Sequence, residues 1–109
     1  MSDRIHLGGD ERTAFEKLEM SLRLGSEAAN AANYGNTMKR LRQAIEAATE
    51  VGVYRSDGRW AGVAERIEKV RTEMTTVSGP AFRIVGFTVA ELLSDMYRSV
   101  VLLRMGRVH

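Results

Sequence analysis

Residues 60–77 read WAGVAERIEKVRTEMTTV, and this stretch decides the fold class. Its apolar residues recur in alternating steps of three and four, which places them on one face of an α-helix. That face consists of Trp60, Val63, Ile67, Val70, Met74 and Val77. The opposite face is charged, as on a helix that turns one side to water. A stretch of about two and a half heptads is too short for a free-standing coiled coil. The apolar face must therefore pack inside a domain or against a partner.

The residues before this stretch predict a first helix over 10–24. Asp10 is a favourable N-cap residue, and Glu11 adds a negative charge in the first turn, where the helix dipole favours it. Gly25 supplies a stop signal at the other end. The residues ahead of the helix, 1–9, are expected to form a flexible N-terminal arm.

A second helix is predicted over 26–51. Ser26 is a favourable start, and Gly52 is a plausible end. Gly35 lies inside this range and costs about 1 kcal/mol relative to alanine in a helix interior. Two alternatives therefore remain open at this position: one helix passes through Gly35, or a short helix ends there and another starts near Thr37.

The last predicted helix covers 88–105. Thr88 and Glu91 have the spacing of a capping box, in which each side chain satisfies a backbone N–H at the helix start. Gly106 is a plausible C-terminal stop. The segment before it, 81–87, is ambiguous between a short extended link and the beginning of the same helix.

This last helix is apolar around much of its circumference. One face is formed by Val89, Leu92, Leu93, Met96, Val100 and Leu103. Val101, Leu102 and Met105 fall outside that face, although they are apolar as well. A helix of this kind needs burial on more than one side. We therefore expect Val101, Leu102 and Met105 to form an interface with a second copy or with another protein.

Together these segments predict an all-α fold, a compact bundle of three to five helices in a single domain over 1–109. The third helix is expected over 60–78, and the joints are Gly25, Gly52–Gly58 and Ser78–Pro80. A chain of 109 residues with 44% hydrophobic and 28% charged residues has ordinary globular composition. The single proline argues against a sandwich or barrel with proline-rich turns.

The sequence offers little for catalysis or for binding a metal or cofactor. It has no cysteine, which excludes a thiolate nucleophile and zinc sites that need sulfur. Its two histidines, His6 and His109, lie near the chain ends, without an identifiable third group to position them. No phosphate-binding glycine loop or dinucleotide fingerprint is present. We therefore expect a protein that is not an enzyme, with no catalytic, cofactor-binding or metal-binding residues.

The charge distribution suggests nucleic acid as an alternative partner. The net charge is +2, and no acidic residue follows Asp95. Two groups of basic residues could contact phosphates: Lys39, Arg40 and Arg42 in the second helix, and Arg98, Arg104 and Arg107 near the end. No aromatic stacking platform alternates with these bases. Tyr34 and Tyr54 lie near them in the sequence, but Phe15, Trp60, Phe82 and Phe87 are expected in the core.

The leading functional hypothesis is a non-catalytic helical interaction subunit, or adaptor, that acts by self-association or by docking to a protein partner. The alternative is a small basic helical subunit that contacts nucleic acid within a larger ribonucleoprotein or phage-type assembly. No apolar run approaches the ~20 residues of a membrane span, and no signal peptide is visible. A cytoplasmic protein without membrane contact is therefore expected.

Overall fold

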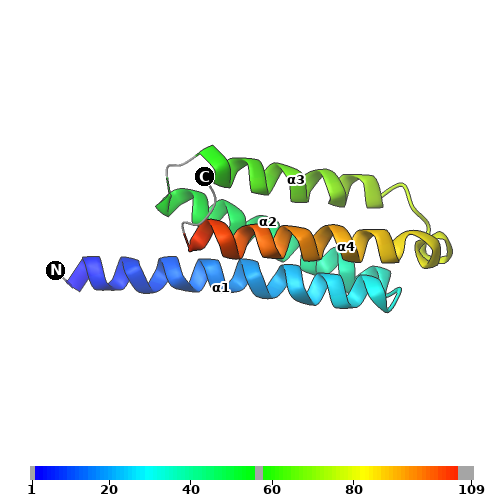
Figure 1. Ribbon diagram of the computed structural model, residues 1–109, viewed down its shortest axis with the longest axis horizontal. Helices are drawn as coiled ribbons and strands as arrows, with labels where there is room; N and C mark the ends of the chain where they lie inside the picture. The colour runs from blue at the N-terminus through cyan, green and yellow to red at the C-terminus, as the bar shows by residue number, and fades with distance from the viewer. Residues whose placement is uncertain (1, 56–57, 106–109) are drawn as a thin grey trace.

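A computed structural model describes residues 2–55 and 58–105, and these residues form four α-helices (Figure 1). They are α1 (Ser2–Asn30), α2 (Tyr34–Tyr54), α3 (Gly58–Met74) and α4 (Gly79–Arg104). Each helix runs antiparallel to the one before it (Figure 1). The described residues contain no strand, so the predicted all-α bundle is confirmed.

The helices form a four-helix bundle, in which α4 lies between α1 and α3 in the view of Figure 1 and α2 lies behind it. α1 makes extensive contacts with both α2 and α4, and α2 packs on α3, but α3 and α4 barely touch. The bundle is elongated, with extents of 53 × 27 × 19 Å. Within the described ranges, no helix is long and apolar enough to cross a lipid bilayer.

α1 is longer than the sequence predicts, because it passes through Gly25 and includes the expected N-terminal arm from residue 2 onward. The predicted arm and the predicted helix end at residue 24 were therefore both wrong. A Cβ atom at Gly25 would lie 3.1 Å from Cδ1 of Leu93 and 3.3 Å from Cβ of Arg40. The glycine lets α1 approach α4 and α2 closely, and it does not end the helix.

The chain turns between α1 and α2, and not at Gly25 or Gly35, where the sequence suggested a helix end. Ala32 adopts a left-handed conformation with φ of 57°. The side chain of Asn33 then accepts a hydrogen bond of 3.1 Å from the backbone N–H of Asn36 and caps α2. The single helix predicted over 26–51 is therefore wrong, because residues 26–30 belong to α1 and the chain turns at 31–33. The break lies just before Gly35 and not at it, so Gly35 falls in the first turn of α2, and α2 continues through Gly52, the predicted end.

α4 begins nine residues earlier than the capping-box pattern predicts. Ser78 is the N-cap and accepts a hydrogen bond of 3.2 Å from the backbone N–H of Ala81. Pro80 lies in the first turn, where its missing N–H has no helical partner to lose. The ambiguous segment 81–87 is therefore helical, and Thr88 lies inside the helix.

The core confirms the apolar face predicted for α3. Trp60, Val63, Ile67, Val70 and Met74 are buried, while Val77 is half-buried. The ring of Trp60 makes an edge-to-face contact with Phe15 of α1, with centroids 5.1 Å apart. The largest fully buried side chains elsewhere come from the other three helices: Leu18, Leu22, Leu41, Val51, Phe82, Leu93 and Val100.

Candidate interaction surface

The outward face of α4 exposes four large apolar side chains. Ile84 is 82% exposed, Phe87 64%, Leu102 42% and Met105, the C-cap residue, 52%. These are four of the seven large hydrophobic residues that are exposed in the described part of the chain. The other three lie on other helices or on the flank of α4: Met20, Val53 and Leu92.

The four residues belong to one stripe along the helix, which we call the outward stripe. It consists of Ile84, Phe87, Glu91, Asp95, Arg98, Leu102 and Met105. Successive members are three or four residues apart, so at about 100° per residue they fall within roughly a quarter of the helix circumference. The stripe lies opposite the buried residues Phe82, Leu93 and Val100 of the same helix. It is apolar at both ends and charged in the middle.

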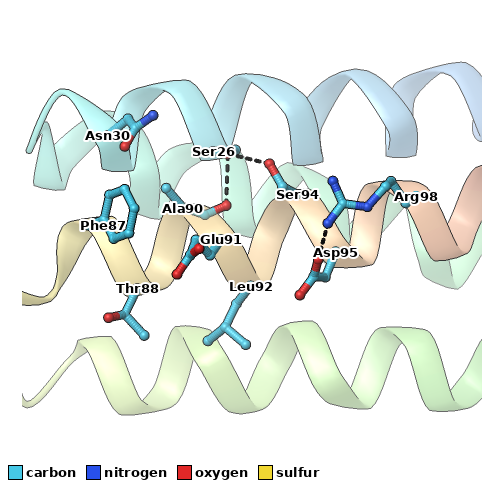
Figure 2. A pocket seen from close by; sticks show the side chains of 10 residues that line it. All are labelled: Ser26, Asn30, Phe87, Thr88, Ala90, Glu91, Leu92, Ser94, Asp95 and Arg98. Carbon is cyan, nitrogen blue, oxygen red and sulfur yellow. Dashed lines mark hydrogen bonds and ion pairs between the residues drawn. The ribbon is translucent and has the colours of Figure 1, made fainter.

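Close contacts with α1 fix the orientation of this stripe. The hydroxyl of Ser26 donates a hydrogen bond of 2.8 Å to the backbone carbonyl of Ala90 and lies 3.0 Å from the hydroxyl of Ser94 (Figure 2). One turn earlier, a Cβ atom at Gly86 would lie only 2.6 Å from the carbonyl oxygen of Ala29. Small residues thus bring the two backbones together, and α4 has little freedom to rotate about its axis.

The neighbouring helices flank the outward stripe without covering it. Figure 2 shows Phe87 directed toward α1 beside Asn30, whereas Thr88 and Leu92 point toward α3. A groove of about 600 Å³ lies between α3 and α4, with Val63, Leu102 and Leu103 among its apolar lining residues. Its α3 wall is basic, with Arg59, Arg66 and Lys69 against one acidic residue, Glu65.

A shallow hollow of about 440 Å³ lies at the middle of the outward stripe, between α1 and α4 (Figure 2). Ser26 and Ser94 line it, and their hydroxyl groups are occupied by each other and by the α4 backbone. Neither hydroxyl has a hydrogen-bonded base of the kind that activates a serine nucleophile. The two hydroxyl groups therefore serve the contact between α1 and α4.

The charged middle of the stripe contains one ion pair. Arg98 donates to the carboxylate of Asp95 three residues before it, and both side chains are largely exposed. Glu91 lies one turn before Asp95 and makes no ion pair with any residue that the structure describes. Because an exposed ion pair contributes little to stability, all three charged groups can take other partners.

The structure separates the three predicted interface residues. Leu102 and Met105 are exposed on the outward stripe, and Leu102 also borders the α3–α4 groove. Val101 is half-buried. It lies seven residues after Ser94, on the side of α4 that faces α1.

The five predicted nucleic-acid contacts that the structure describes are divided between α2 and α4. On α2, Lys39 and Arg42 are exposed, but Arg40 is half-buried and donates a hydrogen bond of 2.9 Å to Gln43. On α4, Arg98 is paired with Asp95, as described above.

Arg104 forms an ion pair of 2.5 Å with Glu19 of α1, so its charge is balanced within the bundle. Arg107 lies outside the described residues.

Sequence reasoning missed Ile84 and Phe87, the two most exposed apolar members of the stripe. It expected Phe87 in the core, and the structure shows that this was wrong, whereas Phe82 is fully buried as predicted. The missing signal was the start of α4, because the regular spacing from residue 84 to residue 105 becomes visible only when the helix begins at Gly79, after the Ser78 cap.

The described residues contain no group of three or more histidine, cysteine, aspartate or glutamate side chains that could hold a metal ion. Comparison of the chain with known protein families, curated proteins and solved structures finds no match. The functional interpretation therefore rests on the surface itself.

Proposed function

We propose that this protein is a non-catalytic interaction subunit that binds protein through the outward face of α4. The observation that carries the proposal is the outward stripe, with Ile84, Phe87, Leu102 and Met105 exposed on one side of a helix whose opposite side is fully used in the core. Exposed apolar side chains that gather on one face of a helix, here in two clusters at the ends of the stripe, are typical of interaction sites, whereas singly scattered exposed hydrophobic residues are normal.

The bundle is suited to present such a face. α4 is held along its length by α1, through the Ser26 hydrogen bonds in the middle and the Arg104–Glu19 ion pair at the end. A face that is rigid before binding loses less conformational entropy on association. The apolar ends of the stripe supply the hydrophobic contribution, and the charged middle supplies direction and specificity.

Site-specific photo-crosslinking tests this proposal. A photoreactive benzoylphenylalanine would be introduced at Leu102 in one variant and at Val53 in another, and each would be irradiated in the cells that make the protein. Val53 is the matched control, because it is 79% exposed on α2, away from the stripe. We expect a discrete protein adduct from position 102 and none from position 53. Equal adducts at both positions, or none at position 102, would refute the proposal.

A nucleic-acid-binding role is the second candidate. It is supported by Lys39 and Arg42, which are exposed on α2 and make no ion pair with the described residues. Phosphate contacts of this kind predict an affinity that falls steeply with salt. The double variant Lys39→Glu/Arg42→Glu should then lose binding to a fluorescent 20-nucleotide single strand and to a duplex of the same length. Unchanged binding would remove this candidate.

A further inference from the structure

We propose that the outward stripe of α4 pairs with the same stripe of a second copy of this chain, antiparallel, around a two-fold axis that passes between Ser94 and Asp95. This inference rests on the proposed function and names its partner. It follows from the order of residues along the stripe, which reads nearly the same from either end in its chemical character.

The apolar ends of the stripe match under this two-fold axis. In an antiparallel pair centred between residues 94 and 95, Ile84 lies at the level of Met105 of the second copy. Phe87 lies at the level of Leu102 of the second copy. By symmetry each contact occurs twice, so the eight apolar side chains of the two copies meet in four layers. All four of these residues are exposed in the single chain. Pairing therefore buries apolar surface that folding alone leaves in contact with water.

The charged residues match in the same register. Glu91 lies at the level of Arg98 of the second copy, and Arg98 at the level of its Glu91. Opposite charges therefore meet twice across the interface. A parallel pairing in register would place Glu91 against Glu91 and Arg98 against Arg98, which is unfavourable. The charge order thus selects the antiparallel arrangement.

The centre of the interface is polar and hollow. Ser94 is small, and the shallow depression beside it leaves space for side chains of the second copy. Asp95 from each copy comes close to the axis, and its charge is balanced by Arg98 of its own helix. The two aspartates nevertheless repel each other, so a neutral residue at position 95 should strengthen the pairing.

The α3–α4 groove is a less suitable site for a second copy. If two such grooves faced each other, the basic residues Arg66 and Lys69 of both copies would be brought together. On the outward stripe the only like charges brought together are the two Asp95 side chains, and each of them is paired with Arg98 of its own helix. Because each copy contributes a single helix, the interface is at the small end of specific interfaces, for which roughly 1,200 Å² is the lower bound of stable complexes. We therefore expect a reversible dimer with a dissociation constant in the micromolar range.

Charge-reversed variants test the register by sedimentation velocity over a range of protein concentrations. Glu91→Arg places two arginines together at both symmetric contacts, and Arg98→Glu places two glutamates together. Each variant alone should dimerise at least about tenfold more weakly than the natural chain. An equimolar mixture of the two should restore the dimer as a heterodimer, because all four charges are then opposed by opposite charges. Arg42→Glu, a reversal on α2, is the control and should leave dimerisation unchanged.

The absence of cysteine from the chain permits a second, independent test. The single variants Glu91→Cys and Arg98→Cys would be mixed under mild oxidation, with a size tag on one of them. A disulfide should join position 91 of one copy to position 98 of the other. Each variant alone should crosslink poorly, because its two cysteines would be about 10 Å apart along the helix axis.

Three results would overturn the inference: a chain that stays monomeric at millimolar concentration, a dimer whose affinity does not respond to the charge reversals, or efficient crosslinking of position 91 to itself. The proposed function fails on a different observation. If the chain is monomeric while the photoreactive residue at Leu102 gives an adduct heavier than two copies, the outward face binds another protein and only the partner named here is wrong.

Discussion

Replacing Gly86 by alanine should destabilise the bundle although alanine is the better helix former. A Cβ atom at this position would lie 2.6 Å from the carbonyl oxygen of Ala29, which belongs to the backbone of α1 and cannot rotate away. A carbon–oxygen contact needs about 3.3 Å, so α1 and α4 would have to separate locally by about 0.7 Å. Strain of this kind costs about 1–3 kcal/mol.

The helix propensity of alanine offsets up to about 1 kcal/mol of that cost. We therefore expect a net loss of about 1–2 kcal/mol in the free energy of unfolding, with a lower melting temperature. Gly62→Ala is the matched control, because Gly62 also lies inside a helix but no neighbouring atom stands within 4 Å of the position that its new methyl group would take. Gly62→Ala should stabilise the protein by up to about 1 kcal/mol.

Urea denaturation followed by circular dichroism at 222 nm measures both effects in one series. Both variants exchange glycine for alanine inside a helix, so a difference in the sign of the change in unfolding free energy must come from the contact at Gly86. If Gly86→Ala is as stable as Gly62→Ala, α1 and α4 do not approach as closely as described, and the orientation assigned to the outward stripe loses its support.

Three further predictions concern the core and its edges. Phe82→Ala should lower the free energy of unfolding by about 3–5 kcal/mol because Phe82 is fully buried. Phe87→Ala should change it by less than about 0.5 kcal/mol, because Phe87 is exposed. Comparable losses for the two variants in urea denaturation would contradict this difference in burial. Tyr34→Phe should lose about 1 kcal/mol, since it removes the hydrogen bond of 2.9 Å that the hydroxyl donates to the carbonyl of Met74; a stability equal to the natural chain would show that water replaces this bond. The hydrogen bond from Arg71 lowers the pKa of Glu68, so the ionised Glu68 side chain contributes to stability above the ordinary pKa of glutamate, and this contribution is lost as the pH falls through the lowered pKa. The melting temperature of the natural chain should therefore fall more between pH 6 and pH 3 than that of Glu68→Gln. Parallel curves of melting temperature against pH would contradict this prediction.

The helical fold could be predicted because its signal is repeated along the chain. The spacing of Trp60, Val63 and Ile67 identifies the buried side of α3 without any knowledge of its neighbours. The boundaries were less predictable, because a glycine or serine signal has more than one physical cause. Gly25 looks like a helix stop, yet it serves the approach of three helices. That distinction depends on tertiary contacts, which a single sequence does not display.

The interaction surface could likewise be predicted where it depends on helix periodicity, and not where it depends on a helix boundary. Leu102 and Met105 could be singled out because they fall outside the core face of a helix that was recognised. Ile84 and Phe87 were missed because the capping-box pattern at Thr88 was interpreted as the helix start, so the helix that aligns them with Leu102 was cut short. An error of about two and a half turns in one helix start thus concealed half of the apolar residues of the stripe.

The charges in the middle of the stripe distinguish a protein partner from a lipid surface. A helix that lies on a membrane needs a continuous apolar face, with its charges on the opposite side. On α4 the apolar ends are separated by Glu91, Asp95 and Arg98, which point the same way as Ile84 and Leu102. Insertion of both ends into the acyl region would bury these charges without partners, at high cost. A protein surface can place an opposite charge against each of them. The order of residues along α4 therefore favours a protein partner, and a second copy offers complementary charges to Glu91 and Arg98 in the required register.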